Sequence, residues 1–290
     1  MIAPPLPPRS VGGAAADCGI TAHAACEARL SAIGGLRDGP FPGGAAPLPA
    51  RFLRHCDEQT VVGMHAVLRA IAALPGPIDL SADAVVAASC QAGRLMAAKS
   101  LSQLKTGGAV TVSTHIVPQA SLHSLAGAVS VALGMHGPHV GIGGGGDALA
   151  EGLLAAVTLA GASGAPRVWL VATEWDEEPP LDAAGAATAD PLCRAAALAV
   201  EPGGSAELSL GVRFPKTPVE AAVADGQLAA FVRALEMCGP GGALVAWTLT
   251  CPWGAELRVA RRRAARAAES TDSRPGRGRA PLAGRLREAA

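Results

Sequence analysis

Apolar and polar residues recur along the chain with two different periods, and this pattern predicts alternating strands and helices through its middle section. Apolar residues at 61, 64, 67, 68, 71 and 74 form one face of a helix over 57–74, with Asp57 as an acidic cap at its start. The short apolar runs over 82–89 and 168–173 are typical of strands that are buried on both faces. Because strand and helix alternate, we expect an α/β layer architecture with a largely parallel sheet.

The same pattern places the other elements. Further helices are predicted over 91–104, 121–135, 147–160 and 219–237. Further strands are predicted over 139–142, 193–200, 207–214, 244–250 and 256–259, with one more possible over 11–20. The strands over 193–200 and 207–214 are consecutive, which predicts antiparallel pairing at a sheet edge. Pro252-Trp253-Gly254 predicts a hairpin between the last two strands.

Composition divides the 290 residues into three parts. Residues 1–50 hold eight prolines and eight glycines, so we expect a Pro/Gly/Ala-rich segment with at most one strand. Residues 51–260 form the expected domain, and residues 261–290 form a disordered basic tail of Arg, Ala, Gly and Pro without period. The net charge of zero hides an asymmetry. Residues 258–290 hold ten basic and three acidic residues, whereas 1–257 hold 14 basic and 21 acidic residues.

Composition also excludes several classes of protein. Aromatic residues make up 3% of the chain and Tyr is absent, which disfavours the stacking surfaces of nucleic-acid and carbohydrate sites. The seven cysteines occur singly with no Cys-x-x-Cys, which argues against a disulfide framework and a structural zinc site. The N-terminus does not resemble a signal peptide, and the long apolar stretch over 125–159 is interrupted by charged residues and histidines. We therefore expect a cytoplasmic protein with no nucleic-acid partner and no membrane span.

The glycine-rich run Gly141–Gly146 satisfies G-x-G-x-x-G between a predicted strand and a predicted helix. In dinucleotide-binding folds such glycines let a pyrophosphate approach a helix N-terminus, and Glu174 could hold the ribose. However, Glu174 lies 28 residues after Gly146, further than the roughly 20 of the pattern. Asp147 is also placed to cap the helix and repel a phosphate. Dinucleotide binding therefore stands as an alternative hypothesis.

Cys90 lies between a predicted buried strand and a predicted helix. A thiolate at this place would be stabilised by the helix N-terminus and could act as a nucleophile. The competing interpretation is a small buried residue at a strand end, because the sequence identifies no base beside it.

Two further groups of polar residues are candidates for a metal site and for an acid–base site. His136 and His139 have the spacing of a metal pair on a helix, but Gly137-Pro138 between them breaks a helix, so turn residues are the preferred interpretation. The acidic residues Glu174, Asp176, Glu177 and Glu178 could perform acid–base chemistry, but a charge run before two prolines is typical of a solvated loop. We expect no metal and no cofactor.

The segment over 112–138 contains an ordered series of small and turn-forming residues: Ser113, Ser124, Ala126, Gly127, Leu133, Gly134, Gly137 and Pro138. This series resembles the N-terminal region of the β-ketoacyl synthase family, in which a Val-Ser-Pro-Thr-type segment precedes a helix that ends in Leu-Gly-x-x-Gly-Pro. The resemblance spans about residues 51–210. It is nearest to the short synthase-like proteins of aryl-polyene and polyketide clusters.

The resemblance implies a thiolase-like half-fold, with a mixed, mostly parallel sheet and helices on both faces. It places the nucleophilic Cys of an active synthase nine residues after Gly137, at Gly146, and a glycine cannot form a thioester. All seven histidines lie at or before residue 139, so the active-site histidines of the family's second half have no counterpart. The stretch over 180–259 is too short for a second copy of the fold.

These departures predict a β-ketoacyl synthase-like protein that is a non-catalytic partner subunit of an active synthase. The pathway would be fatty-acid, aryl-polyene or polyketide biosynthesis. Its expected partners are that synthase and an acyl carrier protein, in a homo- or hetero-oligomer. Two alternatives remain open: an acyl-transfer enzyme that depends on Cys90, and a dinucleotide-binding protein that uses Gly141–Gly146.

Overall fold

The computed structural model describes residues 16–41, 48–49, 51–203, 206–215, 226–239 and 242–262. Within them the chain forms eight strands: β1 (Ala16–Arg29), β2 (Ala84–Cys90), β3 (His139–Gly144), β4 (Val168–Trp175), β5 (Leu192–Pro202), β6 (Leu208–Arg213), β7 (Ala246–Thr250) and β8 (Glu256–Arg261). The α-helices of the same residues are α1 (Leu30–Leu36), α2 (Glu58–Ala72), α3 (Arg94–Gly107), α4 (Ile116–Ala120), α5 (Ser124–Leu133), α6 (Ala148–Ala162) and α7 (Gln227–Cys238). No described helix is long and apolar enough to cross a bilayer.

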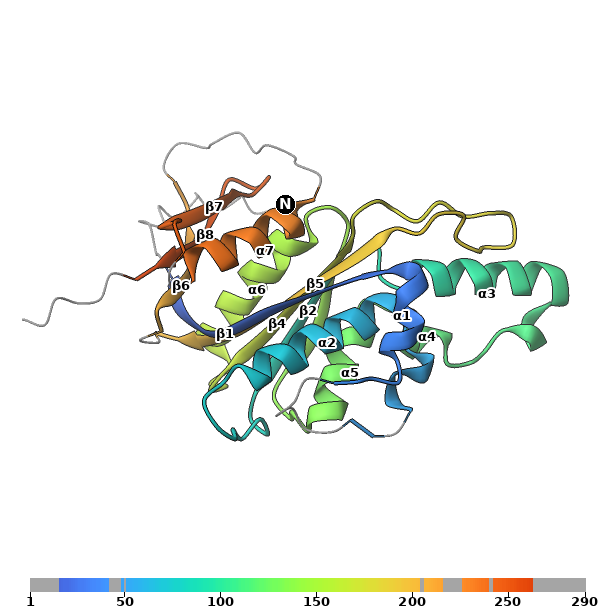
Figure 1. Ribbon diagram of the computed structural model, residues 1–290, viewed down its shortest axis with the longest axis horizontal. Helices are drawn as coiled ribbons and strands as arrows, with labels where there is room; N and C mark the ends of the chain where they lie inside the picture. The colour runs from blue at the N-terminus through green and yellow to red at the C-terminus, as the bar shows by residue number, and fades with distance from the viewer. Residues whose placement is uncertain are drawn as a thin grey trace, which may run out of the picture.

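The strands form one sheet in the order β3-β2-β4-β5-β1-β6-β8-β7. Helices cover both faces, as predicted: α1, α2 and α5 pack on one face, and α6 and α7 on the other (Figure 1). Side chains of β4 alternate between these two layers, with Leu170 in the core beside α6 and Trp169 and Val171 in the core beside α2. All three are fully buried, which explains the continuous apolar run in the sequence.

The expected predominance of parallel pairing is wrong. Strand β2 pairs in parallel with β3 and with β4, whereas the five remaining strand pairs are antiparallel. Parallel neighbours require a crossover connection, and the helices between β2 and β3 and between β3 and β4 supply it for this part of the sheet. After β4 the chain returns through a loop into β5, which therefore runs in the opposite direction.

Strand β1 also changes the expected place of β5 and β6. It pairs with β5 from Cys18 to Arg29 and with β6 from Ala16 to Ile20, so it separates the two strands. The prediction that they pair with each other at a sheet edge is therefore wrong. Composition places a boundary between residues 50 and 51. Strand β1 lies before this boundary, so the sheet contains residues from both of its sides.

Several predicted elements are confirmed. Asp57 caps α2, where its Oδ1 accepts a hydrogen bond of 2.9 Å from the backbone N–H of Thr60. Strands β7 and β8 form the predicted hairpin around Trp253. Residues 11–15 of the possible first strand, residues 219–225 of the last predicted helix and residues 263–290 of the basic tail lie outside the described residues.

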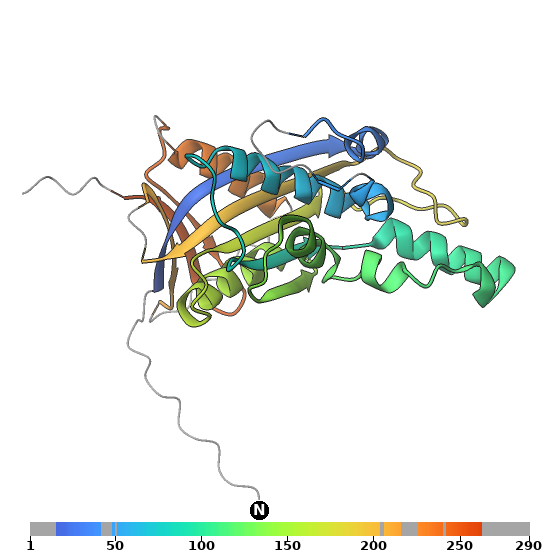
Figure 2. The same cartoon turned by 90° about the horizontal axis from the view of Figure 1, so that it is seen from below.

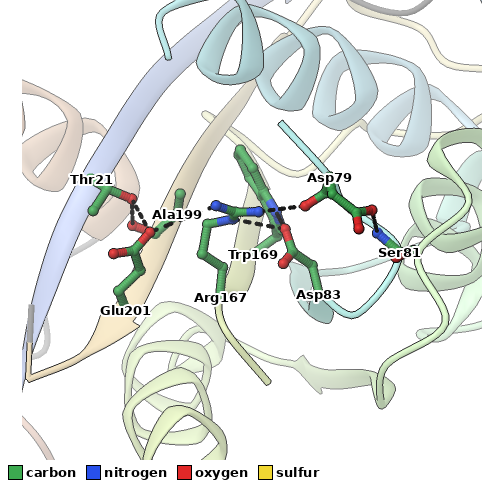
Figure 3. A network of polar contacts seen from close by, with 8 residues as sticks. All are labelled: Thr21, Asp79, Ser81, Asp83, Arg167, Trp169, Ala199 and Glu201. Atoms are coloured by element: carbon green, nitrogen blue, oxygen red, sulfur yellow. Dashed lines mark hydrogen bonds and ion pairs between the residues drawn. The ribbon is translucent and has the colours of Figure 1, made fainter. Parts of the chain in front are cut away.

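A buried polar network ties three strands together at the end of the sheet where β2 and β4 begin (Figure 3). The Oδ2 atom of Asp83 accepts hydrogen bonds of 2.9 Å from both Arg167 Nε and Trp169 Nε1. Arg167 also donates to the backbone carbonyl of Asp79 at 2.7 Å and lies 3.8 Å from Glu201 on β5. Because Asp83 is completely buried, its charge depends on these partners.

We expect Asp83→Ala to lower the free energy of unfolding by about 3 kcal/mol, because it leaves the buried indole N–H of Trp169 without its acceptor and removes an ion-pair partner of the half-buried Arg167 guanidinium. Urea denaturation measures this change. The matched control is Asp79→Ala, whose side chain is exposed and accepts from the backbone N–H of Ser81. This control should change stability by less than about 1 kcal/mol. Equal effects of the two substitutions would contradict the assigned role of Asp83.

Candidate functional site

A cleft of about 820 Å³ opens where β2 and β4 end and where α6 and α7 begin. Ligand sites of α/β proteins commonly lie at this end of parallel strands. Eleven residues line the cleft: Cys90, Gln91, Gly146, Asp147, Glu174, Trp175, Asp176, Glu177, Glu178, Gly226 and Gln227. The structure therefore brings Gly146, Cys90 and the acidic run together, although they are up to 88 residues apart in the sequence.

A layer of hydrogen bonds holds the strand ends beneath the cleft. Gln59 Nε2 on α2 donates to the backbone carbonyl of Cys90 at 2.6 Å. Thr173 Oγ1 on β4 lies 2.7 Å from Ser89 Oγ on β2 and 3.3 Å from Gln59 Oε1. Gln59, Ser89 and Thr173 are buried, so this polar layer fixes the spacing of the two strands.

Gly146 lies on the wall of the cleft, shortly before α6. A Cβ atom built on it would have no other atom within 4 Å, so the position has room for a side chain. Asp147 follows it and also lines the cleft, but its side chain makes no capping hydrogen bond. The expectation that Asp147 caps this helix is therefore wrong, and its carboxylate belongs to the wall of the cleft.

The glycines before Gly146 serve close packing. Gly141, Gly143 and Gly144 lie within β3, paired with β2, and do not form a phosphate-binding turn. A Cβ on Gly141 would lie 2.1 Å from the carbonyl oxygen of Leu122, and one on Gly143 would lie 2.6 Å from the Cβ of Ala148. Close packing thus accounts for Gly141 and Gly143, the first two glycines of the pattern that resembles a dinucleotide motif.

Cys90 is half-buried at the end of β2, and its surroundings disfavour the thiolate. Burial raises the pKa of its thiol, and the negative charges of Glu174 and Glu178 raise this pKa further. A reactive cysteine requires the opposite environment, with nearby positive charge. The helix N-terminus that the sequence places beside Cys90 therefore does not produce an activated thiol.

The acidic residues of the cleft have specific structural partners. Glu174 Oε2 accepts a hydrogen bond of 3.3 Å from the backbone N–H of Leu228 and so holds the start of α7. Burial raises the pKa of this carboxyl. Asp176 forms an ion pair with Arg194, and Glu178 forms one with Arg94. The interpretation of this run as a purely solvated loop is incomplete, because Glu174 connects two elements of the fold.

The two histidines proposed as a metal pair do not come together. His139 stacks on His123 with ring centroids 5.0 Å apart, and the backbone N–H of His136 donates to Ser81 in the turn before β3. Among the described residues, no group of three or more His, Cys, Asp or Glu is placed to hold a metal ion.

The residues that resemble the synthase family build the connection into β3. Ala126 on α5 is fully buried, and Gly134 ends that helix with a left-handed backbone (φ 64°). A Cβ on Gly137 would lie 2.5 Å from the carbonyl oxygen of Asp83, so glycine permits the close approach of this turn to the start of β2. Ser113 lies on the surface, where its Oγ accepts from the backbone N–H of His115 at 3.2 Å.

Sequence patterns did not identify Gln91 and Gln227 as cleft residues. Gln91 has a left-handed backbone with φ 60°, which is uncommon for a residue other than glycine, and it lies directly after Cys90. Gln227 reaches the cleft from α7, more than fifty residues after Glu174. No local sequence pattern predicts that Gln91 or Gln227 lines the cleft, because the cleft forms only when segments far apart in the sequence pack together.

The cleft residues hold five carboxylates and one thiol, with no histidine, lysine or arginine among them. Covalent acyl transfer needs a nucleophile together with a base or a positive environment that activates it. The described lining offers Cys90 no positively charged side chain, and Glu174 and Glu178 raise the pKa of its thiol. The geometry therefore provides a cavity of the size of a ligand site in which the described side chains disfavour a Cys90 thiolate.

The packing role of the glycine run can be tested by two alanine substitutions. Gly141→Ala should lower the free energy of unfolding by about 2 kcal/mol, because its methyl group collides with the backbone of Leu122. Gly145→Ala has open space around it and should change stability by less than about 0.5 kcal/mol. Urea denaturation compares the two variants, and an equal loss at both positions would contradict this account.

The pKa of Cys90 predicts slow alkylation at neutral pH. Because the pKa is raised, the thiolate forms only at higher pH, so the midpoint of the alkylation rate against pH should lie above that of free cysteine. Glu178→Gln removes a negative charge and should lower this midpoint, whereas Glu236→Gln on α7 should leave it unchanged. Peptide mass spectrometry after iodoacetamide treatment measures the alkylation rate of Cys90 against pH in the two variants. A midpoint below that of free cysteine would show an activated thiol.

Comparisons with known proteins identify the architecture. No protein-family model matches the sequence, and no curated protein matches it. Among solved structures, the ketosynthase ApeO in complex with its chain length factor ApeC from Xenorhabdus doucetiae is similar with a TM-score of 0.52 and 16% identity. This match covers 84% of the present chain and 99% of that chain.

Two further structures have lower scores. The ishigamide ketosynthase/chain length factor matches with a TM-score of 0.45 and 18% identity, over 76% of this chain and 73% of that one. A β-ketoacyl synthase from Burkholderia phymatum STM815 matches with a TM-score of 0.45 and 15% identity, over 76% and 69%. At such identities the likeness concerns the fold alone. The chain thus has a ketosynthase-like, thiolase-type fold, as the residue series over 112–138 predicts.

Proposed function

We propose that this chain is a non-catalytic partner subunit of an active β-ketoacyl synthase in aryl-polyene, polyketide or fatty-acid biosynthesis. One observation carries the proposal. Gly146, the position at which the family resemblance places the nucleophilic Cys, lies on the wall of the cleft with open space around it. A side chain would fit there, so the glycine leaves an accessible cleft without its nucleophile.

The electrostatics of the cleft support the same proposal. Burial, Glu174 and Glu178 raise the pKa of Cys90, which is the one thiol among the described residues that line the cleft. A Cys90-dependent acyltransferase is therefore the weaker candidate. Dinucleotide binding is also less favoured, because Gly141, Gly143 and Gly144 are strand residues in close backbone contact or pairing.

The free edge of the sheet supports association with a second subunit. The outer side of β3 has no strand partner among the described residues, and Val140 on this strand is 38% exposed. An apolar groove of about 540 Å³ adjoins it and is lined mainly by Val140, residues of α6 such as Leu154 and Leu159, and Trp253. An unpaired strand beside an apolar groove is suited to pairing with another chain.

The likeness to a ketosynthase–chain length factor complex suggests the class of partner. We infer that an active synthase occupies the β3 edge and that this chain contributes to docking of an acyl carrier protein or to the shape of the acyl channel. We also propose that residues 51–260, together with β1, act as one domain.

Co-expression tests the proposal directly. The chain should co-purify with an active β-ketoacyl synthase from its own organism, and the purified chain alone should release no thiol from an acyl thioester. Val140→Asp on the β3 edge should weaken co-purification at least about tenfold, because it buries a charge in the interface. Val117→Asp is the matched control on an exposed valine outside this edge. A stable monomer that ignores both the synthase and the carrier protein would overturn the proposal.

A further inference from the structure

The candidate cleft carries negative charge that the described residues neutralise only in part. Two of its five carboxylates, Asp176 and Glu178, form ion pairs with arginines. The other three form no ion pair within the part of the chain that the structure describes: Asp147, Glu174 and Glu177. Like charges around one cavity repel one another, so the cleft favours a positively charged occupant.

Two buried oxygen atoms of the cleft also lack a hydrogen-bond donor. Glu174 Oε1, near the end of β4, and Gln227 Oε1, at the start of α7, are buried and have no partner among the described residues. The other carboxylate oxygen of Glu174 accepts from the backbone N–H of Leu228, which holds this side chain in place. Because an unpaired buried acceptor is unfavourable, these two atoms indicate a ligand that brings N–H donors into the cleft.

An arginine side chain combines both properties, because its guanidinium keeps its positive charge and carries five N–H donors and no acceptor. The chain itself contains a group of arginines shortly after the last described residue, Arg262. Residues 263–272 hold two Arg and two acidic residues, so their charges cancel. Residues 273–287, here called the arginine segment, hold five Arg and no Asp or Glu. The charge of the arginine segment is therefore complementary to that of the cleft.

The arginine segment begins within reach of the cleft. Strand β8 ends at Arg261, whose Nε donates to the backbone carbonyl of Cys238, the last residue of α7, at 3.0 Å. Helix α7 lies beside β7 and β8 in both views (Figures 1 and 2). Gln227 at its other end lines the cleft, and the 12 residues of α7 are about 18 Å long. Residues 263–272 can span up to about 33 Å, so they can cross this distance.

We propose that the arginine segment binds in the acidic cleft of its own chain. One guanidinium donates to Glu174 Oε1 and Gln227 Oε1, and others lie beside the carboxylates of Asp147 and Glu177. Its covalent attachment near the cleft favours this segment over a separate cationic ligand, because attachment raises its local concentration. The bound segment makes access to the cleft depend on ionic strength, since salt screens these charges. The proposal is independent of the proposed function, because it concerns the isolated chain and requires no synthase.

Limited trypsin digestion of the full chain tests the proposal. Mass spectrometry compares cleavage after Arg277, inside the arginine segment, with cleavage after Arg266, which precedes the segment and serves as an internal reference. Because the bound segment is protected, raising salt from about 0.05 to about 1 M should raise the ratio of the two rates at least about threefold. At low salt the ratio should be the same at about 1 and about 100 μM protein, because the contact lies within one chain. Protection that grows with concentration would show binding between chains and would overturn the proposal.

Substitutions identify the cleft as the binding site. Asp147→Asn with Glu177→Gln should raise the same ratio at least about threefold at low salt, because they remove two charges that hold the segment. Asp38→Asn with Glu236→Gln removes two exposed charges outside the cleft and should leave the ratio unchanged. Circular dichroism melting confirms that each variant remains folded. Equal ratios in the unchanged chain and in the cleft variant would contradict the proposed contact.

A peptide of residues 273–287 provides a second test that uses no protease. Calorimetry should show that it binds the full chain with Arg274→Gln, Arg277→Gln and Arg279→Gln at least about fivefold more tightly than the unchanged chain, whose cleft is already occupied. The control peptide carries the same three substitutions and should bind at least about tenfold more weakly. Equal binding to the two chains would overturn the proposal, because the cleft would then be empty in both. Binding that persists when Asp147→Asn and Glu177→Gln are added to the arginine variant would place the site elsewhere and would also overturn it.

Discussion

The pairing of β1 with β5 is the constraint on which the rest of the structure depends. Eleven residues of β1, from Cys18 to Arg29, lie opposite residues of β5, while the first residues of β1 pair with β6. This placement joins the parallel part of the sheet to the antiparallel part and gives both helical layers a continuous surface. Without β1, strand β5 would expose a long edge, and β6 to β8 would not be paired with the rest of the sheet.

The same arrangement fixes where the cleft lies and what it contains. Parallel strands β2 and β4 end together over a buried layer formed by Gln59, Ser89 and Thr173. Glu174 at the end of β4 then holds the first turn of α7. Gly146 and five carboxylates line the cleft above this layer, and under the proposed function the cleft therefore lacks the nucleophile that a thioester intermediate needs.

Local sequence patterns predicted most helices and strands. The order and direction of the strands in the sheet depend on long-range pairing, which these patterns do not contain. The Asp57 cap and the apolar period of α2 are local signals, and both are confirmed. The position of β1 depends on partners about 170 residues away, so the sequence showed a possible short strand but not its place inside the sheet. The expected predominance of parallel pairing was wrong because β1 enters the sheet antiparallel to both β5 and β6, and no local pattern indicates this long-range pairing.

For the candidate site as well, local sequence predicted some features, and others depend on contacts that form only in the fold. The residue series over 112–138 led to the correct fold. The glycines at 141–146 could not be distinguished from a phosphate-binding loop, because close backbone approach and ligand binding select the same residue. Likewise, the raised pKa of Cys90 depends on Glu174 and Glu178, which are distant in sequence and adjacent only in the fold.

The central claim of the proposed function is that this cleft forms no covalent acyl intermediate. Intact-protein mass spectrometry of the chain co-purified with an active synthase, after incubation with an acyl thioester, tests it most directly. The account predicts an acyl mass increase on the synthase and none on this chain. An acyl adduct on this chain that maps to Cys90 would contradict it.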